Sequence, residues 1–159
     1  MKMNSVYSQR INFLVRVTKK ECRHLVSTAS RLFLEPFTLA DAAKLEYDQD
    51  LAERVEAFVG RFARLQDTLG DKLLPLLLTA LGEKITSAID NLEKAEKLGL
   101  IASADDWMII RQLRNQMVHE YVEDPVILIS ALNTANAFVP LMIAAASNMH
   151  IEIERRGFS

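Results

Sequence analysis

Glycine, proline and cysteine are scarce in this chain of 159 residues, which has five Gly, four Pro and one Cys. So few turn-forming residues favour long helices over a sheet protein with many turns. The single cysteine, Cys22, excludes an internal disulfide, and no Cys/His pair has the spacing of zinc ligands. We therefore expect a mostly helical, cytoplasmic protein of a reducing compartment, with no metal site and no cofactor.

Long apolar runs are also lacking, although half of the residues are hydrophobic. The longest run, FVPLMIAAA at 138–146, is far shorter than the roughly 20 residues that span a bilayer. Near the N-terminus, Arg10 and Arg16 interrupt the apolar residues, so no signal-peptide core forms. The length suits one domain with one core, and we expect a single domain over 1–159 that does not engage a membrane.

The net charge of -2 hides an uneven distribution of charge. Residues 1–34 carry seven basic side chains against one acid, which gives +6, so the remaining residues sum to -8. A basic helix over 1–34 can attract phosphate groups, although a solvated helix face explains the same charges. The candidate phosphate-binding residues are Arg16, Lys19, Lys20 and Arg23.

The spacing of apolar residues predicts two long helices in the first half of the chain. Alternating three- and four-residue steps over 11–32 place apolar side chains on one side of a helix that Glu35-Pro36 should stop. The same steps over 51–69 predict a second helix, for which Gly70 offers a C-cap. Between them, Thr38 should cap a short helix.

Four more helices are expected in the second half. One restarts after Asp71, and another spans Glu83–Leu98. Ser103 should cap a helix of about 104–123. The last helix follows Pro125 and is apolar for most of its length, so it should lie in the core or at a subunit interface.

The stretch RNQMVHEY, residues 114–121, holds the candidate chemistry of the chain. Arg114 and Tyr121 are seven residues apart and share a helix face, whereas His119 points about 140° away from Arg114 at 100° per residue. One straight helix therefore does not bring the arginine and the histidine together. A two-fold partner would, by placing one subunit's pair beside its copy.

RNQMVHEY resembles the Arg-x4-to-6-His motif of HEPN domains, and its tyrosine resembles the Arg-x4-His-x-Tyr form of the HepT branch. Asn115 matches the polar residue that HEPN proteins commonly carry after the arginine. A second block, RFARLQDTLGDKLLP at 61–75, resembles a stretch in relatives encoded beside small nucleotidyltransferases. The similarity covers roughly 50–148 and leaves the basic N-terminal segment outside it.

The resemblance implies an all-α, antiparallel helical bundle that forms a two-fold homodimer. It implies the toxin of a toxin-antitoxin pair, a metal-independent endoribonuclease with Arg114 and His119 as catalytic residues. Asn115 and Glu120 are candidate supporting residues, since an amide can orient the substrate or the histidine and a nearby carboxylate can raise the pKa of the histidine. The basic helix would then bind RNA. The antitoxin would be an MNT-type nucleotidyltransferase that transfers AMP to Tyr121 and so blocks the cleft.

Two other functions fit the same residues. A non-catalytic helical module that binds a nucleotidyltransferase, or presents its substrate, would keep the motif as a docking or modification site. A purely structural helical dimer explains the apolar seams but not the motif.

Overall fold

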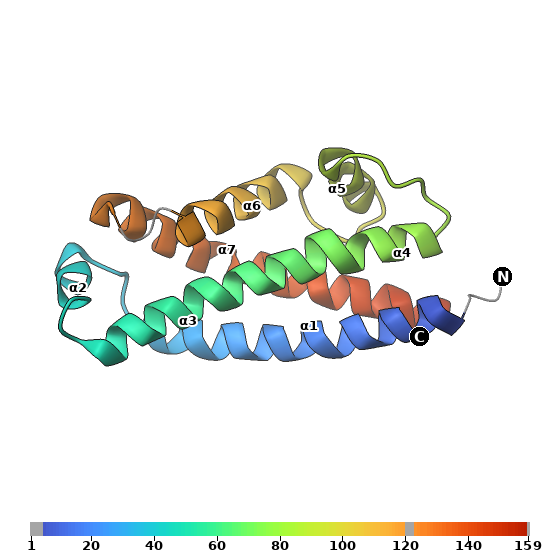
Figure 1. The fold of residues 1–159 in the computed structure, drawn as a ribbon. Helices are drawn as coiled ribbons and strands as arrows, with labels where there is room; N and C mark the ends of the chain where they lie inside the picture. The colour runs from blue at the N-terminus through green and yellow to red at the C-terminus, as the bar shows by residue number, and fades with distance from the viewer. Residues whose placement is uncertain (1–4, 120–122, 159) are drawn as a thin grey trace.

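The computed structural model describes residues 5–119 and 123–158, and every regular element in these ranges is a helix (Figure 1). In chain order the elements are α1 (Ser5–Leu32), α2 (Leu39–Lys44), α3 (Gln49–Gln66), the π-helical segment η1 (Asp67–Leu73), α4 (Leu74–Ala80), α5 (Ala88–Lys97), α6 (Ala104–His119) and α7 (Pro125–Arg156). The predicted all-α class and helical bundle are confirmed.

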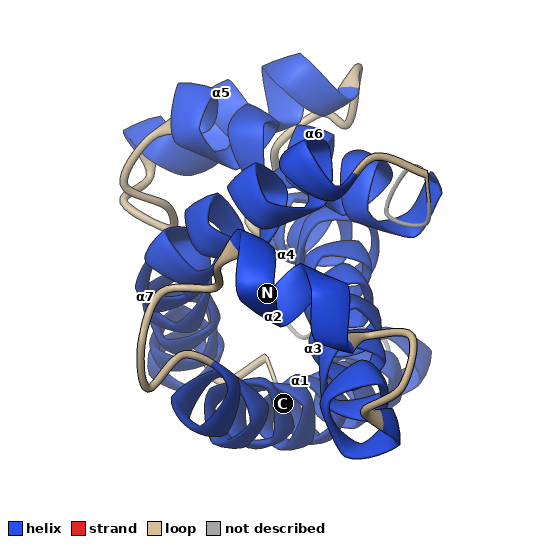
Figure 2. Cartoon of the chain, turned by 90° about the vertical axis from the view of Figure 1, so that its left-hand side faces the viewer, coloured by secondary structure: helices blue, strands red, loops and turns tan. Residues whose placement is uncertain are grey.

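Four rods form the bundle: α1, the continuous rod α3-η1-α4, α6 and α7. The α3 rod packs against α1 and α6, and α7 packs against the same two helices. Consecutive rods run in opposite directions along the long axis (Figure 1). Seen end-on, α1 and α6 occupy opposite corners, with α3 and α7 between them, and α2 lies across the near end (Figure 2).

The apolar seams of α1 and α3 supply much of the core. The predicted α3 seam is buried from Val55 to Leu69, with Phe58 and Phe62 fully buried. On α1 the buried stripe differs from the predicted one. Leu14 and Thr28 are buried in addition to it, whereas Val15 and Cys22, which the spacing includes, are only partly buried. The reason is that α1 packs against both α3 and α7, and two neighbours cover more than one narrow stripe.

Several helix ends follow the signals in the sequence. Thr38 and Asp41 form a reciprocal capping box at the start of α2. The Ser103 side chain accepts a hydrogen bond from the Asp106 backbone N–H at the start of α6. The α1 helix ends at Leu32, shortly before Pro36, and Gly99 adopts a positive φ of 75° after α5.

The expected helix end at Gly70 is wrong, because the chain continues through η1 without leaving helical geometry. Pro75 accounts for the wide turn: it has no N–H, and in an α-helix its ring would crowd the carbonyl four residues earlier. Widening the preceding turn relieves that contact. Accordingly, the Leu74 N–H donates to the carbonyl of Leu69, five residues back.

The helix predicted over Glu83–Leu98 is shorter than expected. Residues 83–87 are not helical, and α5 begins at Ala88 with Ser87 as its N-cap. The Asn91 side chain accepts a hydrogen bond from the Thr86 backbone N–H, which holds the segment before the cap in a non-helical turn. The last helix does begin at Pro125, capped by Asp124.

The long helix α7 is apolar enough, by length and composition alone, to cross a membrane, with a mean hydropathy of 1.8 over its most apolar window. In the bundle it packs against α1, α2, α3, α4 and α6. Its buried residues, which include Leu132, Ala135, Met142 and Met149, form one wall of the core. The role of a core helix therefore accounts for the apolar side that α7 turns inward.

Candidate functional site

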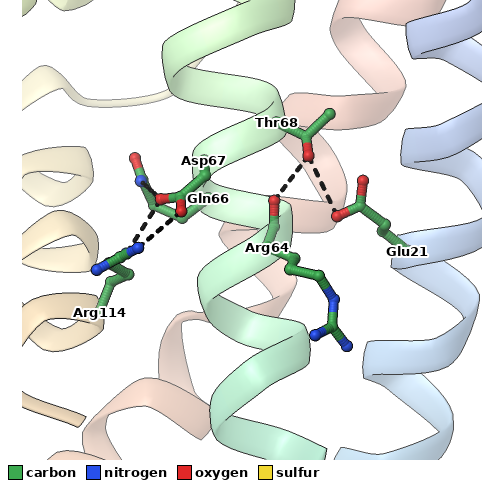
Figure 3. A network of polar contacts seen from close by, with 6 residues as sticks. All are labelled: Glu21, Arg64, Gln66, Asp67, Thr68 and Arg114. Carbon is green, nitrogen blue, oxygen red and sulfur yellow. Dashed lines mark hydrogen bonds and ion pairs between the residues drawn. The ribbon is translucent and has the colours of Figure 1, made fainter. Parts of the chain in front are cut away.

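Arg114 lies on α6 at the boundary with the α3 rod, where Asp67 opens the π-helical segment (Figure 3). Its guanidinium makes two hydrogen bonds to that carboxylate: Nε donates to Oδ1 at 3.1 Å, and Nη2 donates to Oδ2 at 2.8 Å. This two-point geometry fixes the plane of the guanidinium as well as its position.

Both members of this ion pair remain partly exposed, with 26% of the Arg114 side chain and 34% of the Asp67 side chain accessible. The hydrogen bond to Asp67 raises the pKa of Arg114, with a smaller contribution from the nearby charge of Asp71. Arg114 is therefore a permanent cation that solvent reaches but that already has a carboxylate partner.

A buried network fixes Asp67 from the side opposite to solvent. The amide of Gln66 donates to Asp67 Oδ1 at 2.8 Å, and Gln66 Oε1 accepts the indole N–H of Trp107 at 3.2 Å. Gln66 and Trp107 are each only 2% exposed. A Cβ at Gly70 would lie 2.8 Å from Gln66 Oε1 and 2.9 Å from Trp107 Nε1, so only glycine leaves room for this contact.

His119 is the last residue of α6, and its side chain is exposed. No residue in the described ranges hydrogen-bonds to its imidazole. Because α6 is helical from Ala104 to His119, the expected separation of about 140° between Arg114 and His119 holds along the helix. One chain thus presents the two side chains in different directions.

The other predicted motif residues are placed as follows. Asn115 is exposed and lines a shallow hollow between α5 and α6, beside Ile89 and Ile109. Asn115 thus lies beside α5, whereas Arg114 contacts Asp67 of η1. Glu120 and Tyr121 lie outside the described residues.

The four predicted RNA-binding residues, Arg16, Lys19, Lys20 and Arg23, are all exposed on α1. Together with Phe13 and Val17 they line one surface depression on this helix. Arg10 extends the surface, since its guanidinium carbon lies 5.4 Å from the centre of the exposed Phe13 ring. We call the four residues the α1 basic surface.

A groove beside the α1 basic surface adds two arginines that the sequence did not single out. Lys20 and His24 of α1 line it together with Arg61 and Arg64 of α3. Arg61 donates to the carbonyl of His24 and to the hydroxyl of Thr28, so it is fixed on α1, whereas Arg64 is exposed. The positive charge therefore continues from α1 onto α3.

One acid, Glu21, interrupts this groove. Burial raises the pKa of its carboxyl, while the hydrogen bond from Thr68 and the charges of Arg64 and Lys72 act in the opposite direction. Its Oε1 is buried without a hydrogen-bond partner in the described part of the chain. Glu21 therefore places one partly buried carboxyl among the basic residues that line this groove.

The α1 basic surface and Arg114 lie on two helices, α1 and α6, that flank the α3 rod. Glu21 of α1 and Arg114 of α6 reach the α3 rod from opposite sides (Figure 3). This agrees with the diagonal arrangement of α1 and α6 in the end-on view (Figure 2). An RNA strand that contacts both on one chain would have to cross the α3 rod, on which Arg64 is exposed.

Other histidines and the cysteine have structural surroundings. His24 is exposed, whereas His150 is half-buried with Nε2 at 2.7 Å from the Thr18 hydroxyl. Burial, with the charge of Lys19, lowers the pKa of His150 to about 4. Burial raises the pKa of Cys22 to about 11, which leaves its thiol protonated at neutral pH. Over the described ranges, no group of three or more His, Cys, Asp or Glu residues is arranged to hold a metal ion.

The chain matches no protein-family model, no curated protein and no solved structure in comparisons of its sequence and fold. The assignment of its function therefore depends on the motif and on the geometry around Arg114. Spacing along the sequence does not predict Asp67 as the partner of that arginine, although Gln66, Asp67 and Gly70 all lie in the block 61–75 that carries the second resemblance.

Proposed function

We propose that this protein is a HEPN-type toxin of the HepT branch, a metal-independent endoribonuclease that a partner nucleotidyltransferase neutralises. The observation that carries the proposal is that both side chains of the motif, Arg114 and His119, reach solvent. Arg114 is oriented by a carboxylate and still reaches solvent, and His119 is exposed at the end of the same helix.

These two residue types suit cleavage of RNA by its own 2'-hydroxyl. The 2'-oxygen attacks the adjacent phosphorus, a base takes the hydroxyl proton, and the departing 5'-oxygen receives a proton. Histidine exchanges protons near neutral pH, and such acid-base help increases rates by roughly 10²- to 10⁴-fold. Arg114 stays charged and can hold the phosphate oxygens as negative charge builds on them.

The proposal requires a homodimer, because Arg114 and His119 point in different directions on one helix. A two-fold partner would set the His119 of one copy near the Arg114 of the other. Light scattering at micromolar concentration should then give twice the chain mass of 18.0 kDa. A stable monomer would remove the shared cleft from the proposal.

Tyr121 is the proposed AMP acceptor, by the resemblance of the motif alone. An adenylate there would add bulk and negative charge beside the phosphate-binding arginine. Tyr121→Phe should remain active and escape control by the nucleotidyltransferase, whereas the wild type should lose activity as AMP is incorporated. Mass spectrometry of the peptide that contains Tyr121 measures the transfer.

The ion pair between Arg114 and Asp67 favours a second function. The contact between Arg114 and Asp67 joins α6 to the α3 rod, and this structural role needs no substrate. The chain would then be a non-catalytic module that binds a nucleotidyltransferase, with the motif as its docking or modification site.

An RNA cleavage assay in EDTA separates the two functions. The wild type should cut total RNA without metal. His119→Ala should abolish cutting while RNA binding persists, and Arg114→Ala should weaken both. His24→Ala removes another exposed imidazole, from α1; because His24 lines the groove beside the α1 basic surface, this control should keep the cleavage step even where RNA binding weakens.

Circular dichroism must show that each variant is folded. If His119→Ala cuts as well as the wild type, or if cutting requires added magnesium, the ribonuclease mechanism is wrong. The module that binds a nucleotidyltransferase is then the better description.

A further inference from the structure

The ion pair with Asp67 uses only one edge of the Arg114 guanidinium. A guanidinium has five N–H donors in one plane. Asp67 takes the Nε donor and one Nη2 donor. The second Nη2 donor and one Nη1 donor form the end edge, which also matches two oxygens of a phosphate, and the other Nη1 donor points to the third side.

The carboxylate that holds the first edge is itself held in place. Asp67 Oδ1 accepts from both Arg114 Nε and Gln66 Nε2. Gln66 is buried and is oriented by the indole of Trp107, which lies on α6 two turns before Arg114. Gln66 and Asp67 of the α3 rod therefore connect two residues of α6, Trp107 and Arg114, by hydrogen bonds.

Local backbone geometry explains why this connection is possible. Asp67 keeps the α-helical geometry of α3, with its N–H bonded to the carbonyl of Ala63 four residues back, and the π-helical segment begins at this residue. Gly70 lets Gln66 and Trp107 approach each other. These features favour one orientation of Asp67 over a mobile surface carboxylate.

We propose that Asp67 is a positioning residue for Arg114, which holds one edge of the guanidinium so that the other edge faces a phosphate of the substrate. The inference deepens the proposed function and rests on it for the identity of the substrate. Whether Asp67 orients Arg114 for phosphate does not depend on whether the protein cleaves RNA, and it can be measured with inorganic phosphate alone.

If Asp67 instead competes with phosphate for the guanidinium, it weakens phosphate binding. Removal of its charge would then increase the affinity for anions, as removal of any nearby acid would. Asp71 provides the comparison: it acts on Arg114 through charge, is exposed, and makes no side-chain hydrogen bond to it in the described structure. Asp67→Asn and Asp71→Asn change the net charge equally, and only the first removes a contact with the arginine.

The experiment titrates inorganic phosphate into isotope-labelled protein and follows the Nε–H resonance of Arg114 by NMR. Asp67→Asn should weaken phosphate binding by about tenfold, as expected for a misplaced charged hydrogen bond. It should also broaden the Nε–H signal, since the side chain loses its fixed orientation. Asp71→Asn should bind phosphate as tightly as the wild type, or more tightly, with the signal unchanged.

Phosphate binding by Asp67→Asn equal to or tighter than that of Asp71→Asn would overturn the proposal. If Asp67→Asn does not fold, Gln66→Met tests the same point, because it leaves Asp67 charged but removes the donor that orients it. Weaker phosphate binding in Gln66→Met supports the positioning role, and unchanged binding contradicts it.

A cleavage assay separates this inference from the proposed function. If the wild type cuts RNA, Asp67→Asn should raise KM and lower kcat together, because Arg114 contacts phosphate before and during the reaction. If the wild type cuts no RNA, the ribonuclease proposal fails, while the phosphate titration still decides whether Asp67 positions Arg114.

Discussion

Asn133 and Phe37 exchange two hydrogen bonds of 2.9 Å across 96 residues of sequence. The Asn133 side chain accepts from the Phe37 backbone N–H and donates to the Phe37 carbonyl, which ties the segment after α1 to α7. Phe37 itself is buried, so these backbone groups have little access to replacement water.

Asn133→Ala should destabilise the protein by about 2 kcal/mol, since both backbone groups of Phe37 lose their partner. Thermal unfolding should show a fall in Tm of roughly 4–8 °C for a chain of this size. Asn136→Ala, on the same helix, is the control, because the described structure gives its side chain no hydrogen bond. Equal Tm values for the two variants would contradict the role given to Asn133.

Gly70→Ala should destabilise the bundle by roughly 1–3 kcal/mol, because its Cβ would force Gln66 and Trp107 apart. In most helices the same change is favourable by about 0.5–1 kcal/mol. Gly60→Ala provides that comparison on α3, since its Cβ would meet only the flexible end of Arg64 at 3.3 Å. Chemical denaturation should give opposite signs for the two substitutions, and equal signs would contradict the close approach at Gly70.

The lowered pKa of His150 predicts a loss of stability in mild acid. Since its folded pKa of about 4 lies below the ordinary 6.5, the unfolded chain takes up the proton first as the pH falls. The contribution is complete above pH 6.5 and is lost toward pH 4, at most about 3 kcal/mol. Glu21 has a raised pKa and acts with the opposite sign, so the test compares variants rather than one curve.

His150→Gln keeps an N–H that can reach Thr18 but does not titrate. The free energy of unfolding of this variant should therefore fall less than that of the wild type between pH 6.5 and 4. His24→Gln, which removes an exposed histidine, should follow the wild-type profile. Parallel curves for all three proteins would show that His150 does not contribute to acid sensitivity.

The α1 basic surface should contribute to RNA binding if the chain acts on RNA. Lys20→Glu with Arg23→Glu should weaken binding and reduce the slope of log affinity against log salt by roughly 1.5–2, because fewer counterions are released. Lys84→Glu with Lys97→Glu makes the same charge change at exposed positions near α5 and should have less effect. Equal losses in both variants would indicate only a response to net charge.

Local signals in the sequence predicted the helix ends that depend on neighbouring residues. The capping box of Thr38 and Asp41, the cap at Ser103 and the turn at Gly99 each involve residues a few positions apart. Gly70 failed as a helix end because its smallness serves the contact of Gln66 with Trp107, on another helix. From the sequence alone, a glycine in a helical pattern can indicate either the end of the helix or a close contact with another helix.

The candidate site was predicted only in part for a similar reason. Arg114 and His119 stand out by their spacing, and their positions on α6 follow from helix geometry. The partner of Arg114 lies 47 residues earlier on another helix, and the contact depends on how α3 and α6 pack together, which spacing along the chain does not reveal. The diagonal placement of α1 and α6 likewise depends on the order of packing around the bundle.

The π-helical segment also sets the phase of the rod that contains it. A turn closed from Leu74 to Leu69 holds one residue more than an α-helical turn, so the side chains after it are shifted around the axis. If the same residues formed a regular α-helix, α4 would be rotated by about 100° relative to α3, and Leu74, Leu77 and Leu78 would leave the core. Deletion of one residue from η1 would instead keep these leucines inside, because it removes the one residue that the wide turn takes up. The rod can therefore lose one residue within 67–73 without turning its inner side outward, whereas a deletion elsewhere along it would rotate everything that follows.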